Sequence, residues 1–154
     1  MILGDPIEKE DAQAGQEAVQ GKTTLQFLYV PANTEKGEIL VKSFDGDEEM
    51  NPKAVTPATS TIFQRVVVAT EDQGSTAGFQ WCVVEGDCEA LVSGSANVAK
   101  DDFLEVVNGA DNLIKDASTR SEKSVAIARE AYTTSADALK KVSLLGERSV
   151  ISAT

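Results

Sequence analysis

The chain is predicted to be all-β: a small barrel or sandwich with an extended N-terminal arm and at most short helices. Runs rich in β-branched and aromatic residues recur along the sequence, and Gly, Asp, Asn and Pro separate them. Their spacing of roughly 8 to 12 residues is typical of all-β barrels and sandwiches. A length of 154 residues suits one compact domain. We therefore expect an arm over residues 1–21 and a single β-barrel-like domain over residues 22–154.

The first strand is predicted where a polar, alanine- and glutamate-rich segment gives way to TTLQFLYV at residues 23–30. β-branched and aromatic side chains of this kind suit a pleated, half-buried surface. Asn108-Gly109, between two later runs, is typical of a tight hairpin turn. The further predicted strands cover residues 37–44, 61–70, 79–84, 88–92, 102–107, 112–115, 124–132 and 141–145.

Two segments have a weaker strand signal. Residues 47–60 contain two prolines, which cannot donate to a ladder, so we predict a loop with at most an edge pairing. Residues 121–139 are alanine-rich and could be helical by propensity. The alternation within 124–132 favours a strand there, and residues 135–140 are predicted to form a turn or short helical piece.

The predicted arm carries a few apolar residues near its start, which are Met1, Ile2, Leu3 and Ile7. A purely solvated tail would not need such anchors. Segments that become ordered on binding can cover a large surface for their length. We therefore predict that these four residues bind a partner.

Charge and hydropathy exclude several classes of partner. The formal net charge is −11 and the pI is near 4.4. Nucleic-acid affinity depends on clustered Lys and Arg, so no nucleic-acid partner is expected. No apolar run approaches the roughly 18 residues of a membrane span, and MILGDPIEKEDAQ does not resemble a signal peptide. We expect no membrane partner and synthesis in a cytoplasm.

The sequence predicts neither an enzyme nor a cofactor-binding protein. It contains no histidine, which excludes Ser–His and Cys–His nucleophilic pairs. Gly15 and Gly21-Lys22-Thr23 partly resemble a phosphate-binding loop. However, five residues rather than four separate the two glycines, and a β-rich run follows where that loop requires a helix.

No metal site is predicted either. The acidic cluster Asp45, Asp47, Glu48 and Glu49 does not have the spacing of an EF-hand loop. Two cysteines without a histidine are too few for a structural zinc site. We interpret the acidic cluster as part of a solvated loop.

Cys82 and Cys88 have the same strand parity and flank Glu85-Gly86-Asp87. If this tripeptide reversed the chain, the two cysteines would face each other, and a disulfide is geometrically conceivable. A reducing cytoplasm favours two free, partly buried thiols instead. Trp81, with Phe79 on the same face of its predicted strand, is interpreted as the centre of the core.

A series of short motifs runs through residues 78–145. Its residues are Val84, Gly86, Ala90 to Val92, Gly94, Ala99, Asp101 or Asp102, Leu104, Val125 to Ala128, Glu130 to Tyr132, and Val142 to Gly146. This order resembles the small β-barrel decoration, or cement, proteins of tailed-bacteriophage heads, which show V-x-G, x-ALV-x-G, A-x-GD-x-L, VAIA-x-EAY and V-x-LLG in turn. One departure is Lys100, which replaces the glycine before the aspartate and puts the tightness of that turn in question.

The resemblance implies a structural virion protein that binds the outer surface of the phage capsid shell and stabilises it. It further implies the major capsid protein as partner and a homo-oligomer, a trimer or dimer on capsid symmetry axes, on the capsid exterior. Many weak, identical contacts repeated over a lattice gain avidity without a single strong site. The alternatives are another virion component, such as a tail, fibre-attachment or baseplate module, and a cytosolic ligand-binding barrel.

Overall fold

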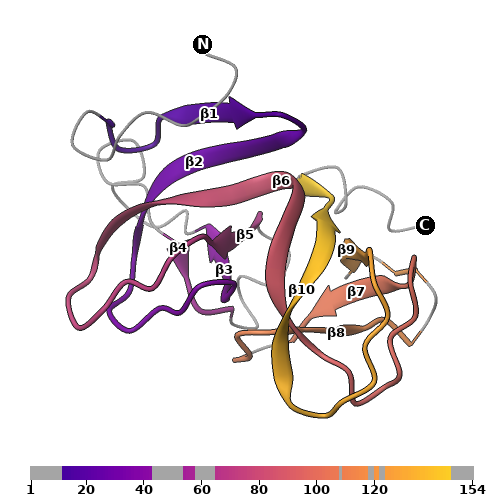
Figure 1. Cartoon of the computed structure of the whole chain (residues 1–154). Coiled ribbons are helices and arrows are strands. Elements are labelled where there is room, and N and C mark those ends of the chain that lie inside the picture. The colour runs from indigo at the N-terminus through magenta and orange to yellow at the C-terminus, as the bar shows by residue number, and fades with distance from the viewer. Residues whose placement is uncertain are drawn as a thin grey trace.

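The computed structural model describes residues 12–42, 54–57, 65–107, 109–117, 120–121 and 124–146. Within these residues the chain forms ten β-strands and no helix (Figure 1). The predicted all-β fold class is confirmed. The strands are β1 (Glu17–Gln20), β2 (Thr23–Val30), β3 (Ile39–Lys42), β4 (Ala54–Val55), β5 (Val66–Ala69), β6 (Gly78–Ser93), β7 (Phe103–Val106), β8 (Leu113–Lys115), β9 (Ser124–Ala128) and β10 (Asp137–Leu144).

The strands form an open sheet and a closed barrel that share β6. The open sheet is antiparallel, with the order β1-β2-β6-β5-β3-β4. In the barrel, β6 pairs with β10, β10 with β9, β9 with β7, β7 with β8, and β8 again with β6. This circuit of five strands has no open edge, and its β6–β8 pairing is parallel. Figure 1 shows β6 running along the open sheet and then bending into the barrel.

β6 is one strand of 16 residues rather than the two strands predicted over 79–84 and 88–92. The predicted break between two strands at Glu85-Gly86-Asp87 is wrong, and the conditional reversal of the chain at this tripeptide does not occur. Gly86 lies at the bend with a φ of 99°, a left-handed conformation that favours glycine. Pairing with β2 before the bend and with β10 after it keeps the backbone extended.

Part of the predicted N-terminal arm lies in the open sheet. Residues 17–20, assigned to the arm, form β1 and pair antiparallel with β2. Ala18 is buried in the main core cluster, and the Gly15 N–H donates to the Phe27 carbonyl oxygen at 2.7 Å. Residues 15–20 of the predicted arm are therefore hydrogen-bonded to the sheet. A strand this short and polar forms because β2 supplies its hydrogen-bonding partners. Its own composition therefore does not predict it.

The alanine-rich segment contains the predicted strand, although β9 ends at Ala128 rather than at residue 132. β10 begins at Asp137, so the turn or helical piece predicted for residues 135–140 is wrong from that residue onward. In β10, Asp137 lies opposite Ser93 and Lys141 opposite Glu89 on β6. This ladder outweighs the weak strand propensity of Ala and Lys.

Two local predictions are confirmed. β7 and β8 form the expected hairpin, in which Val106 pairs with Leu113 and Gly109 has a φ of 76°; Asn108 lies outside the described residues. Of the predicted loop 47–60 only residues 54–57 are described, and there β4 pairs with β3 at the end of the open sheet, which is the predicted edge pairing.

Hydrophobic side chains are buried on both faces of the open sheet. Trp81 is 6% exposed in the larger cluster, which continues into the barrel, so its predicted core position is confirmed. Its ring centroid lies 5.2 Å from that of Phe27, and the Phe27 ring stacks on Phe79 at 5.3 Å. Because successive strand residues face opposite sides, a second cluster lies on the other face. Its members are Leu28, Val30, Leu40, Ala54, Val67, Cys82 and Val84.

Gln80 is a fully buried polar residue that joins β6 to the segment before it. Its side-chain amide donates to the Glu71 carbonyl oxygen at 3.2 Å and to Gln73 Oε1 at 3.1 Å. Its Oε1 accepts a hydrogen bond from the Thr70 N–H at 3.0 Å. These bonds satisfy the amide and attach the connection between β5 and β6 to the sheet.

Asp116 is a second buried polar residue, and it closes the connection between β8 and β9. Its Oδ2 accepts hydrogen bonds from the hydroxyls of Ser121 at 2.6 Å and Ser124 at 2.7 Å. Its N–H donates to the Phe103 carbonyl oxygen at 2.9 Å. A buried carboxylate needs such donors, so this arrangement makes Asp116 part of the barrel framework.

Candidate interaction surfaces

The sequence-predicted partner-binding residues Met1, Ile2, Leu3 and Ile7 lie outside the described residues. The acidic cluster at residues 45–49 also lies outside them. The candidate surfaces are therefore formed by strands and loops among the described residues.

Gly21-Lys22-Thr23 belongs to a β-hairpin. β1 ends at Gln20, Gly21 and Lys22 connect the strands, and Thr23 begins β2. The Thr23 hydroxyl donates to the Asp87 carbonyl oxygen at 2.7 Å, which ties the hairpin to the bend of β6. A phosphate-binding loop leads into a helix, whereas this tripeptide leads into a strand.

Both cysteines are free thiols on the same strand. Six residues of extended chain span up to about 20 Å, whereas a disulfide requires Cα atoms within roughly 7 Å. Since β6 does not reverse between them, Cys82 and Cys88 cannot be bonded within one chain. Burial raises the pKa of the Cys88 thiol to about 12, and the negative charges of Asp87 and Glu89 add to this rise. Cys88 is therefore a protonated, weakly nucleophilic thiol at neutral pH.

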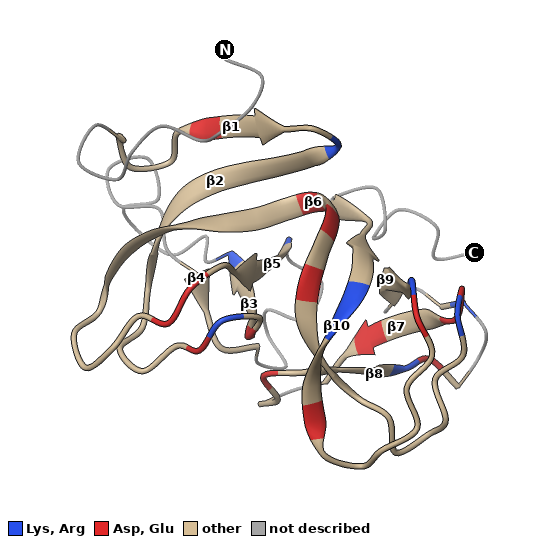
Figure 2. Ribbon diagram, viewed as in Figure 1, with Lys and Arg blue, Asp and Glu red and all other residues tan. Residues whose placement is uncertain are grey.

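The outer barrel face beside β6 carries an alternating acidic row formed by Glu85, Asp87 and Glu89, all exposed (Figure 2). Lys141 on β10 lies opposite Glu89 in the ladder. Arg129, just after β9, is held beside Lys141 because its backbone N–H donates to the Lys141 carbonyl oxygen at 2.9 Å. The acidic row is thus bordered by two cations from neighbouring elements.

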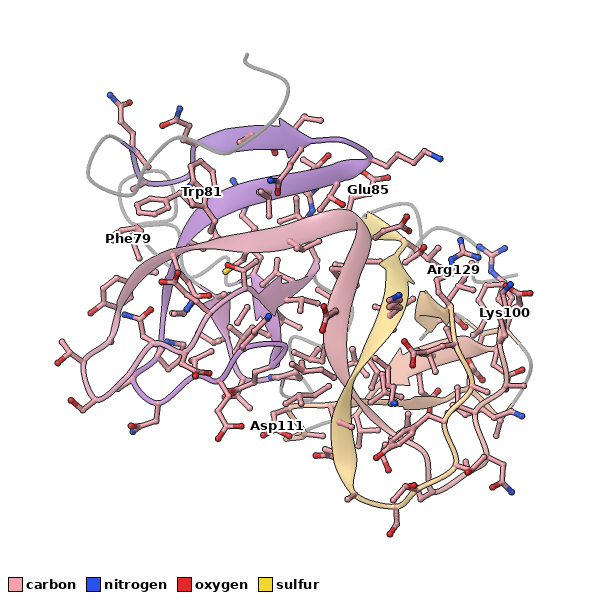
Figure 3. All side chains as sticks on the ribbon, in the orientation of Figure 1. Phe79, Trp81, Glu85, Lys100, Asp111 and Arg129 are labelled. Carbon is pink, nitrogen blue, oxygen red and sulfur yellow. The ribbon has the colours of Figure 1, made fainter. Side chains whose placement is uncertain are left out.

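These charged groups form a connected polar network. Arg129 Nε donates to Ser143 Oγ at 2.7 Å, and the Ser143 hydroxyl donates to Asp87. Arg129 Nη1 also lies 3.4 Å from Asp101 Oδ1 (Arg129 is labelled in Figure 3). A hollow of about 360 Å³ is lined here by Asp87, Cys88, Glu89, Arg129, Lys141 and Val142.

This hollow is suited to polar contact. Its charged groups are of both signs and partly pair with each other, so the hollow could form ion pairs with a partner surface that also carries both charges.

A second hollow of about 320 Å³ lies near Asp102, whose Oδ2 is 3.0 Å from Lys115 Nζ. The Ala99 N–H and Lys115 hold the pKa of Asp102 below its usual range. Among the described residues, no group of three or more His, Cys, Asp or Glu side chains could hold a metal ion.

The second candidate surface is the barrel tip, defined as residues 94–99 and 131–136. These two loops, GSANVA and AYTTSA, contain no charged residue, and most of their side chains are exposed. The Gly94 N–H donates to the Thr134 carbonyl oxygen at 2.9 Å, and Val98 and Tyr132 form a two-way bridge. Figure 2 shows the loops in tan beyond the lower end of β10. The tip presents neutral and mostly small exposed side chains on a hydrogen-bonded backbone.

No protein-family model and no curated protein matches the chain. The described part of the structure also contains no helix that is long and apolar enough to cross a membrane.

The residues of the mixed-charge hollow were not identified from the sequence. Asp87, Arg129 and Lys141 are far apart along the chain and meet only because β6, β9 and β10 are neighbours. The signal for the barrel tip was present, since two charge-free segments stand out in so acidic a chain. Only the barrel closure shows that they lie side by side.

An acidic group also lies where the open sheet meets the barrel. The Ile39 N–H donates to the Asp111 carbonyl oxygen at 2.9 Å, and Glu38 Oε2 accepts from the Glu35 N–H at 2.9 Å. Partial burial raises the pKa of the Glu38 carboxyl above its usual range. The Glu35 N–H opposes this shift, whereas the negative charges of Asp111 and Glu35 reinforce it (Asp111 is labelled in Figure 3).

We therefore expect Glu38→Gln to raise the melting temperature at pH 7. Since the folded-state pKa is raised, the stability that Glu38 contributes is fully present below its unfolded pKa, near 4.5. That stability is lost as pH rises through the folded-state pKa. The Glu38→Gln variant carries no charge at this position at any pH. Its gain in melting temperature over the intact protein should therefore shrink toward pH 4 in a series of thermal melts.

Glu85→Gln is the control, because it removes the same charge at an exposed position. It should change the melting temperature by less. A Glu38→Gln variant that melts below the intact protein at pH 7 would contradict the assignment of Glu38 as a destabilising carboxylate.

Proposed function

We propose that the chain is a structural protein of a tailed-bacteriophage virion, which binds the outer surface of the capsid shell and stabilises it. One observation carries this proposal. The segment that resembles the decoration proteins, residues 78–145, coincides with β6 to β10 and so with the whole closed barrel. A resemblance that spans a complete structural unit is stronger support than the same motifs scattered between units.

Two glycines of the motif series, Gly86 and Gly94, occupy positions without room for a β-carbon. A β-carbon built at Gly86 would lie 2.2 Å from the Lys22 carbonyl oxygen, and one at Gly94 would lie 2.7 Å from the Thr134 backbone. The turn that contains Lys100 is held together by a side-chain hydrogen bond. Asp101 adopts a φ of 72°, and the Ala99 N–H donates to Asp102 Oδ2 at 2.8 Å. The departure from the family pattern at Lys100 is therefore accommodated by this turn.

The surface chemistry is compatible with lattice binding. A net charge of −11 opposes non-specific association between copies. The barrel tip offers contact area without charged groups to desolvate, and its exposed side chains are short, so little rotamer entropy is lost on docking. The major capsid protein is the partner that we propose, with avidity gained from many identical weak contacts.

The test uses phage heads built from the capsid proteins of the same genome. We expect the purified chain to decorate these heads in electron micrographs and to raise their resistance to heat. Deleting residues 2–11 removes Ile2, Leu3 and Ile7 but keeps the described sheet, including β1. This truncated chain should melt close to the intact protein and bind heads at a much lower copy number.

Each alternative has a distinct outcome. If neither form binds heads but the intact chain binds purified tails or baseplates, the protein belongs to another part of the virion. If the truncated chain decorates heads as fully as the intact chain, the predicted partner-binding residues are not required. Loss of folding on truncation would place residues 2–11 in the core.

A further inference from the structure

β1 is the outermost strand at one end of the open sheet. It pairs with β2 in the register Ala18 opposite Leu25, with Glu17 opposite Gln26. The Phe27 N–H donates to the Gln16 carbonyl oxygen at 2.9 Å, so the peptide groups of alternate residues 16, 18 and 20 face β2. The N–H and C=O groups of Glu17 and Val19 therefore point away from the sheet.

Within the described residues, this outer edge is short but open to pairing. Among the described strands, none but β2 pairs with β1. Natural edge strands are commonly blocked by proline, lysine, a bulge or a covering element. The sequence of β1, EAVQ, contains no proline, lysine or glycine. Two donors and two acceptors are thus presented in the spacing that another antiparallel strand requires.

We propose that this edge pairs with the β1 strand of a second copy of the chain, antiparallel and across a two-fold axis. The two outward residues determine the register. When Ala18 faces Ala18 of the second copy, Glu17 of each chain faces Val19 of the other, and all four outward groups on each chain are used. A two-fold axis makes the two halves of such an interface identical, as in most homodimers.

The electrostatics favour this register over its neighbours. A shift that places Glu17 opposite Glu17 would set two carboxylates directly across the interface, which is destabilising. A shift to Val19 opposite Val19 would move Glu17 against Gly21 in the hairpin turn, where the strand has ended. In the chosen register each Glu17 faces a valine, and its Oε1 is 4.0 Å from Arg65 Nη1 of its own chain. The small Ala18 side chains permit close approach at the axis.

The test is the concentration dependence of mass for the full-length chain, measured by sedimentation or light scattering. We expect a monomer–dimer equilibrium that strengthens with added salt, because screening reduces repulsion between two chains of charge −11. Val19→Pro removes one outward N–H but no bond to β2, a position where edge strands tolerate proline. It should weaken dimerisation by about tenfold or more. Val19→Thr keeps the N–H and should dimerise like the intact chain.

Hydrogen exchange provides a readout that needs no variant. The amides of Glu17 and Val19 should exchange slowly in concentrated protein and rapidly on dilution, whereas the Ala18 amide, bonded to β2, should not respond. A chain that is monomeric at every concentration, or a Val19→Pro variant that still dimerises fully, would overturn the proposal. Pairing through this edge is independent of the proposed function, since a dimer would form whether or not the chain binds heads.

Discussion

Gly86→Ala is expected to destabilise the protein by more than about 4 kcal/mol, which places it among the most damaging single substitutions. A β-carbon at this position would lie 2.2 Å from the Lys22 carbonyl oxygen and 2.9 Å from Thr23 Cα. Both are backbone atoms, so the contact cannot be relieved by a rotamer change. The φ of 99° adds backbone strain for any residue with a β-carbon. Urea denaturation of both proteins measures the loss.

Gly109→Ala separates the backbone strain from the steric contact of the added β-carbon. Gly109 also has a positive φ, 76°, but a β-carbon there would meet no heavy atom within 4 Å. It should cost only the backbone strain, about 1–2 kcal/mol. If Gly86→Ala costs no more than Gly109→Ala, then the close passage of β6 under the β1–β2 hairpin is not a constraint on the fold.

Trp81→Ala is expected to cost about 3–5 kcal/mol. Trp81 is 6% exposed, and its ring lies against Phe27 in the larger core cluster. Figure 3 labels Trp81 near Phe79. Truncation removes these contacts and leaves a cavity that strands of the sheet cannot collapse to fill. Chemical denaturation measures the difference in the free energy of unfolding.

Trp81→Phe keeps an aromatic ring and should cost clearly less than Trp81→Ala. Because Trp81 is the only tryptophan, the intrinsic fluorescence of the intact protein reports on this site alone. The emission should be blue-shifted and poorly quenched by iodide. Emission typical of exposed tryptophan, together with a small cost for Trp81→Ala, would place this side chain at an interface instead.

Some elements could be predicted because their signal is local. β2 was expected at residues 23–30 and occupies Thr23–Val30, since TTLQFLYV is bounded by a turn and a proline. The β7–β8 hairpin followed from Asn108-Gly109, although only Gly109 is described. In both cases propensity and turn chemistry agree with the tertiary structure.

The candidate surfaces were harder to anticipate. The network of Asp87, Arg129 and Ser143 joins residues from three places in the chain, and no local pattern connects them. Gln80 and Asp116 are buried polar residues of types that are usually exposed, and their partners become apparent only in the folded chain.

The sequence by itself determined the all-β class, the buried position of Trp81 and the places where short turns occur, because alternation and turn residues act over a few positions. The tertiary structure decided that β6 continues through Glu85-Gly86-Asp87, that residues 17–20 join the sheet, and that β10 begins at Asp137. Each depends on a ladder with a strand contributed by another part of the chain. The hydrogen bonds of such a ladder outweigh local preference, and closure of the barrel by β6, β10, β9, β7 and β8 is their combined result.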